Sequence, residues 1–135
     1  MAASPEIDVR NALNTLIGSL TTGTNLFAGK MRETGPYVPD AAVFVQIIAG
    51  TAPQAFGAAT SFQQFASAVN ILLRSDPDDY AGSHTLVKSI QTALDKVALA
   101  GYIEVRALQA DPYGIGEDIK RRHYWELNIE LIHDR

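Results

Sequence analysis

Near the end of the chain, two acids and a histidine lie close enough in sequence for metal chemistry. Glu117 and Asp118 precede His123 within one polar segment. Carboxylates and an imidazole that converge on a divalent cation can activate water for hydrolysis. One interpretation is therefore a small metal-dependent nuclease, or another enzyme, that uses these three side chains. The alternative is a surface histidine beside a polar loop, because a single histidine is a weak ligand signal.

A second acidic group, Asp76, Asp78 and Asp79, follows an apolar run. Carboxylates suit Mg²⁺ or Ca²⁺, but the glycine and glutamate spacing of an EF-hand is absent from the sequence around them. Asp76 before Pro77 is also typical of a helix start, since an aspartate caps the first turn and a proline fits the first helical position. The helix dipole would stabilise the two acids that follow, because they lie in the first turn, at its positive end. This pattern predicts a capped helix.

The sequence contains none of the motifs of several other catalytic classes. It has no nucleophile elbow, no HExxH pair, no Walker loop and no GxGxxG. The two glycines of residues 113–116, reading YGIG, come before an expected strand, so they lack the helix N-terminus that would hold a phosphate. We therefore expect no catalytic residues, no cofactor and no bound metal.

Three aromatic residues, Tyr102, Tyr124 and Trp125, allow two interpretations. They could form a stacking platform for single-stranded nucleic acid, or they could pack in a sheet. Trp125 lies in a strictly alternating run beside the acid Glu126, which favours packing. The formal net charge of −4 also argues against binding driven by clustered lysine and arginine.

The composition is that of a globular domain. The chain has 135 residues, 47% of them hydrophobic and 19% charged, so it can bury a sizeable core and does not have the composition of a disordered protein. It has no cysteine, which excludes disulfides, thiolate zinc sites and cysteine nucleophiles and is compatible with the cytoplasm. No run approaches the roughly 18 to 20 apolar residues that cross a bilayer. We expect residues 1–135 to form one soluble domain without a membrane partner.

The first half of the chain predicts one helix and several strands. Ser4 caps a helix that begins at Pro5 and ends by Gly23. Its apolar face consists of Val9, Leu13, Leu16, Ile17 and Leu20. The remaining predicted segments are a short strand at 24–27, a turn at 35–39, a central strand at 41–48, a flexible loop at 49–61 with Phe56 at its apolar tip, and a strand at 65–73.

The second half predicts an amphipathic helix and two strands. The helix begins at Pro77 and ends at Gly101, strands follow at 102–108 and 125–132, and residues 111–121 form a loop. Helix and strand order predicts an α+β fold, a mainly antiparallel sheet with two main helices packed on one face. A mixed sheet is the alternative, because the strands before and after the second helix would be parallel if they formed a crossover.

Several phrases of the sequence resemble a known family. They are VNILLRSDPDDY at 69–80 with a helix after it, GYIEV at 101–105, a Gly-x-Asp loop with arginines from Gly116, and the alternating strand that ends in NIELI at 128–132. Together they resemble the small tail terminator and tail completion proteins of long-tailed bacteriophages, also described as minor capsid proteins. The resemblance covers roughly residues 40–132.

The resemblance implies a virion protein of the tail and neck region that is assembled in the host cytoplasm. Such proteins form a ring, usually a homohexamer, on the head-proximal end of the tail tube. The ring stops tube polymerisation and joins the tail to the head connector. The implied partners are other copies of the chain, the tail tube protein and a head connector or head-completion protein, while DNA passes through without sequence-specific binding.

A ring subunit needs two complementary surfaces, and the two long loops expected at 49–61 and 111–122 are the candidates. Opposite charges in the second segment are available to neighbouring copies. The residues that we expect at a subunit or partner interface are Phe56, Phe62, Tyr113, Glu117, Asp118, Lys120 and Arg121.

Overall fold

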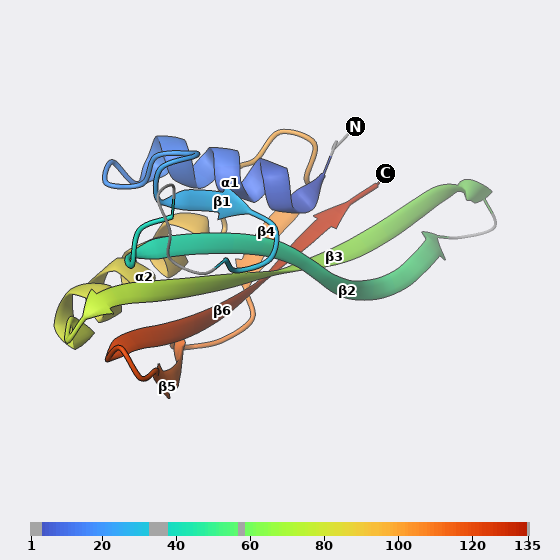
Figure 1. Ribbon diagram of the computed structural model, residues 1–135. Helices are drawn as coiled ribbons and strands as arrows, with labels where there is room; N and C mark the ends of the chain where they lie inside the picture. Colours follow the sequence, from blue (N-terminus) through green and yellow to red (C-terminus); the bar gives the residue numbers. More distant parts are fainter. Residues whose placement is uncertain (1–3, 33–37, 57–58, 135) are drawn as a thin grey trace.

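The computed structural model describes residues 4–32, 38–56 and 59–134, with the backbone alone over 49–56 and 59–64. The described residues form two helices, each followed along the chain by three strands (Figure 1). In order they are α1 (Pro5–Leu16), β1 (Leu26–Ala28), β2 (Ala42–Phe56), β3 (Ala59–Pro77), α2 (Tyr80–Leu94), β4 (Glu104–Ala107), β5 (Tyr113–Glu117) and β6 (Arg122–His133).

The strands form one sheet in the order β1-β2-β3-β6-β4, with β5 also paired to β6. All pairs are antiparallel except β1 with β2. Because β3 occupies one side of β6 along its whole length, β4 and β5 lie on its other side, end to end. The prediction of an α+β fold with a mainly antiparallel sheet is therefore confirmed. The strands β3 and β4 do run in the same direction, but β6 lies between them.

Both helices pack on the same face of the sheet. The alternation of β6 places Trp125, Leu127, Ile129 and Leu131 in one buried row, as the sequence predicts. This row belongs to the main core, in which Val9 and Leu13 come from α1 and Val87, Ile90 and Leu94 come from α2. None of the helices in the described ranges is long and apolar enough to span a bilayer.

The opposite face of the sheet is largely polar. Asn70 at its centre donates hydrogen bonds from Nδ2 to Glu126 Oε2 and Asn128 Oδ1, both at 2.9 Å. A small apolar cluster covers one end of this face, where Phe27 stacks on Phe44 with 5.4 Å between ring centroids. Both helices and most of the apolar core are therefore on one side, and the other side carries hydrogen-bonded polar residues over its middle.

The predicted flexible loop at 49–61 is wrong. Its two flanks continue β2 and β3, which pair as far as Phe56 and Ala59 and form a long hairpin. The ladder has three register shifts, and two of them contain Gly50 and Pro53, residues that fit poorly in a regular strand. Figure 1 shows this hairpin projecting beyond the rest of the molecule.

Other boundaries also differ from the predictions, those of the two helices most clearly. The second helix is capped by Asp79 and not by Asp76, because β3 continues through Pro77 and pairs with β6 there. It ends at Leu94 and not at Gly101, and α1 ends at Leu16, well before Gly23. The predicted loop at 111–121 contains β5. The predicted turn at 35–39 lies mostly outside the described residues.

Candidate functional site

The turn between β5 and β6 is organised by the carboxylate of Asp118. Its Oδ1 accepts hydrogen bonds from the backbone N–H groups of Lys120 at 3.0 Å and Arg122 at 3.1 Å. Its Oδ2 accepts from Arg122 Nε and from the Tyr124 hydroxyl, both at 2.8 Å. Desolvation would raise the pKa of Asp118, but these hydrogen bonds hold it well below its ordinary value. The carboxylate is therefore fully engaged within its own chain.

Arg122 connects this turn to the start of β2. Its side chain is buried, and its Nη2 lies 2.7 Å from Asp118 Oδ2 while its Nη1 donates to Asp40 Oδ1 at 3.1 Å. Burial would lower the pKa of Arg122, but the hydrogen bond with Asp118 is among the contacts that raise it. The guanidinium stays charged and acts as a fixed bridge between two segments far apart in sequence.

Arg74 is a second buried arginine on the same side of the sheet, 2% exposed. It donates to three backbone carbonyl oxygens, those of Asp40 and Arg32 at 2.7 Å and of Pro39 at 2.8 Å. Its guanidinium also lies over the Phe44 ring, 5.4 Å from the centroid. The planar fork of an arginine suits this arrangement, since several fixed acceptors are met at once. Arg74 thus holds the segment before β2 against the sheet.

Arg121 joins the same turn to the corner between β3 and α2. Its Nε lies 2.6 Å from Asp78 Oδ1, and its carbonyl oxygen accepts from the Asp78 backbone N–H at 2.8 Å. Both residues have positive φ angles, 64° and 63°, which non-glycine residues adopt rarely. The expected role of Asp78 in the first helical turn is therefore replaced by a role in this corner.

The three residues of the metal hypothesis do not share one site. His123 Nε2 lies 3.5 Å from Glu117 Oε2, but Asp118 is directed to Arg122 and Tyr124. Among the residues that the structure describes, no group of three histidines or acids is arranged to hold a metal ion. His133 also lies elsewhere, where its Nε2 is 2.9 Å from Ser67 Oγ.

The aromatic residues pack within the protein. Trp125 is buried and donates from Nε1 to Ser83 Oγ at 2.9 Å. Its ring lies 5.2 Å from that of Tyr80 and 5.0 Å from that of His84. The hydroxyls of Tyr102 and Tyr124 bond Asp8 and Asp118 instead. The packing interpretation is thus confirmed for Trp125, and the three rings do not form one stacking platform.

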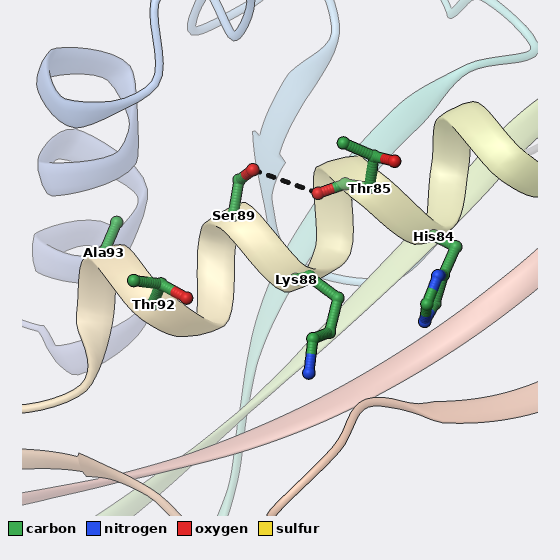
Figure 2. Close-up of a pocket in the computed structure, with 6 residues that line it drawn as sticks. All are labelled: His84, Thr85, Lys88, Ser89, Thr92 and Ala93. Atoms are coloured by element: carbon green, nitrogen blue, oxygen red, sulfur yellow. Dashed lines mark hydrogen bonds between the residues drawn. The ribbon is translucent and has the colours of Figure 1, made fainter.

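A broad hollow follows the outward surface of α2. It has a volume of about 550 Å³, is open to solvent and is lined by His84, Thr85, Lys88, Ser89, Thr92 and Ala93. Figure 2 shows His84 and Lys88 pointing to one side of the helix, while the Ser89 hydroxyl bonds the Thr85 carbonyl. The Lys88 ammonium is paired with Asp111 Oδ1 at 2.8 Å. The lining carries no nucleophile with an adjacent base, and we assign it no chemistry.

Five of the predicted interface residues lie together on the β5–β6 hairpin. They are Tyr113, Glu117, Asp118, Lys120 and Arg121. Every residue of β5 is exposed, and Tyr113 is 59% exposed. Sequence reasoning missed two further apolar residues here, Ile115 at 51% and Ile119 at 97% exposure. The sequence does contain a signal for them, because large apolar residues are unusual in a segment that is otherwise typical of a polar loop.

The other two predicted interface residues, Phe56 and Phe62, lie on the strands of the projecting hairpin. Their side chains are outside the described part of the structure. Since β3 runs from this hairpin at one end to the β5–β6 turn at the other, the two predicted segments occupy opposite ends of the sheet (Figure 1). The structure therefore presents two separate candidate surfaces.

Comparisons with known proteins support the fold. No family model matches the sequence, and no curated protein matches it. A chain in the solved virion of a native gene transfer agent (GTA) particle has a similar structure, with a TM-score of 0.64. The match covers 98% of this chain and 96% of that one at 12% sequence identity. At this identity the likeness establishes a shared fold over essentially the whole chain.

Proposed function

We propose that this chain is a structural virion protein. The observation that carries the proposal is the fold shared end to end with a component of a GTA virion particle. The sequence resemblance to phage tail proteins, which rests on separate evidence, leads to the same class. Fold alone does not define a function, so the proposal also depends on the two candidate surfaces described above.

Within that class we propose the role of a tail terminator. The chain would form a ring, a homohexamer, on the head-proximal end of a tail tube. The ring would end tube polymerisation and bind the head connector. A closed ring requires two different surfaces that complement each other on neighbouring subunits. The sheet of this protein has two different edges, β1 on one side and β4 with β5 on the other, which is the kind of asymmetry that a ring requires.

The projecting hairpin supports association directly. In the described ladders, β2 has no partner on its outer side beyond Val45, and β3 has none on its outer side before Phe65. Backbone N–H and C=O groups along such edges readily pair with another strand. We therefore propose that the hairpin, with Phe56 and Phe62, reaches a neighbouring subunit or the tube.

The charged residues of the β5–β6 turn contribute unequally to this proposal. Asp118 is committed to Arg122 within the chain, so its role is to fix the turn. Arg121 is paired with Asp78 in a pair that solvent reaches, with side chains 70% and 57% exposed. Exposed pairs are weak and exchange partners easily. Glu117, Lys120 and Arg121 are thus the charges that we propose for contacts with a partner, where they would set register more than affinity.

The proposal includes the absence of enzymatic activity, cofactor and metal. The engagement of Asp118 by an arginine and a tyrosine weakens the alternative of a metal-dependent nuclease that uses Glu117, Asp118 and His123. Turnover of DNA with Mg²⁺ by the purified protein, lost in both Glu117→Ala and His123→Ala, would establish that alternative instead.

Native mass spectrometry combined with a tube-length assay tests the terminator role. We expect the purified protein to form closed rings, alone or on tube ends, and to stop the growth of tubes of its cognate tail tube protein. Phe56→Asp should weaken rings or capping while the melting temperature is unchanged, and Thr92→Asp on the exposed surface of α2 is the matched control. A protein that stays monomeric and leaves tube length unaltered would refute the role.

A further inference from the structure

The exposed edge of β5 has the features of a strand that is covered in an assembly. It pairs with β6 on one side, and the ladders of the described residues contain no strand on its other side. Tyr113 and Ile115 are both more than half exposed, and Gly114 packs so closely on Trp125 that a Cβ there would lie 3.3 Å from the indole ring. The strand is therefore packed against the core at Gly114 and leaves two apolar side chains exposed.

Acids stand at both ends of this edge. Asp111 precedes β5 and Glu117 is its last residue, and both are exposed. Asp111 forms an exposed ion pair with Lys88 at 2.8 Å, and Glu117 Oε2 lies 3.5 Å from His123 Nε2. Such exposed pairs are weak, so both carboxylates can take a new partner. In the following turn Arg122 is buried and paired with Asp118 and Asp40, whereas Lys120 and Arg121 are exposed. The strand β5 therefore carries two exposed apolar side chains with a carboxylate at each end.

The opposite edge of the sheet carries a hollow of complementary character. It has a volume of about 350 Å³, and its lining includes β1 together with Thr22 and Gly23. The charged residues of the lining are Arg10 and Arg32. Arg32 lies over the Phe27 ring, 4.9 Å from the centroid, so its guanidinium is held beside an apolar surface. We call this feature the β1 hollow.

We propose that the β5 edge of one copy of this chain seats in the β1 hollow of the next copy. The inference deepens the ring proposal and rests on it. Ile115 and Tyr113 would cover the apolar surface of the hollow, and Asp111 and Glu117 would face Arg10 and Arg32. Because the two surfaces lie on opposite edges of one sheet, the contact is heterologous and each copy retains one free surface of each kind until the ring closes.

The chain contains no cysteine, so introduced thiols report this contact without background. The test uses the full-length variants Ala28→Cys, in β1, and Ile115→Cys, in β5, with a short bifunctional thiol cross-linker that tolerates an error of one residue in register. We expect neither single variant to cross-link with itself. An equimolar mixture of the two should give a covalent dimer, and the double variant should give a ladder that ends at the ring's subunit number.

The matched control pairs Ala28→Cys with Thr92→Cys, which places the second thiol on the exposed surface of α2 and should give no covalent dimer. Dimers of Ile115→Cys alone would show a two-fold contact between β5 edges and would overturn the proposal. Native mass spectrometry of the same samples separates the two levels of inference. Intact rings without cross-links in the mixture would overturn this contact and retain the ring, whereas monomers throughout would overturn both.

Discussion

At the scale of single residues, two buried arginines hold the segment before β2 on the polar side of the sheet. Arg74 donates hydrogen bonds to the backbone carbonyl oxygens of Arg32, Pro39 and Asp40. A lysine keeps the charge but cannot reach three fixed acceptors at once. We therefore expect Arg74→Lys to lower the free energy of unfolding by about 2 kcal/mol, measured by urea denaturation.

Arg10→Lys is the matched control for this prediction. The Arg10 guanidinium is partly exposed and bonds the neighbouring Asn11 side chain, so the change should stay within about 0.5 kcal/mol. If Arg74→Lys and Arg10→Lys lower the free energy of unfolding equally, the hydrogen bonds from Arg74 to the three carbonyl oxygens do not stabilise the fold specifically.

Asp118 makes a prediction about acid stability. Its pKa is lowered in the folded protein, so its contribution is present above the ordinary carboxylate pKa and is lost as the pH falls towards the folded value. We expect the difference in unfolding free energy between the wild type and Asp118→Asn to be constant near neutral pH and to shrink below about pH 4. Glu104→Gln, in an exposed acid on β4, should show no such change. A difference that grows on acidification would contradict the assignment.

At the scale of elements, β6 is the central strand on which the fold depends. Leu127 is fully buried in its middle, between β3 and the helices. Leu127→Ala should cost about 2 to 5 kcal/mol of unfolding free energy, because it removes apolar contact and leaves a cavity. Ile119→Ala, at a position 97% exposed, should change stability by less than about 0.5 kcal/mol. If Leu127→Ala lowers the free energy of unfolding by less than about 0.5 kcal/mol, as expected of the control, the strand is packed loosely.

The elements that could be predicted from sequence are those with a clear period. The alternation from Trp125 to Leu131 defines β6, and Ser4 with Pro5 defines the start of α1, although the Ser4 side chain makes no capping hydrogen bond. The sequence predicts a start of α2 three residues too early, because Asp76 is as good a capping residue as Asp79 and is followed by Pro77. Only the pairing of Pro77 with Arg122 across the sheet decides between them.

At the scale of the whole molecule, the projecting hairpin predicts a separation between folding and assembly. Thr51 and Ala66 are opposite each other in the ladder, so replacing residues 52–65 with Asn-Gly would close the strands with a tight turn. We expect this variant to unfold cooperatively, since the core formed by the residues whose side chains are described lies outside the removed segment, but to lose rings or tube capping. Sedimentation velocity and thermal melts measure the two properties. If the shortened chain assembles as well as the wild type, the hairpin is not needed for association, and the contacts between subunits lie at the sheet edges alone.

The candidate surfaces could be predicted in part. Sequence placed Tyr113, Glu117 and Lys120 in one segment, and the structure brings them to one hairpin. The β1 hollow had no local signal, because it is assembled from a helix, a turn and an edge strand that only the tertiary fold brings together. Pairs of distant residues such as Arg122 and Asp40 were beyond prediction for the same reason.

The position of β6 in the chain also sets the order of events during synthesis. Residues 122–133 are translated after β3, β4 and β5, yet all three pair with β6. A ribosome that has made the chain only as far as β5 therefore carries a β5 segment without the strand that forms its ladder. Long-range pairing of this kind is completed late. The edge that we propose for joining subunits therefore forms only after residues 123–126, its partners in β6, have been translated.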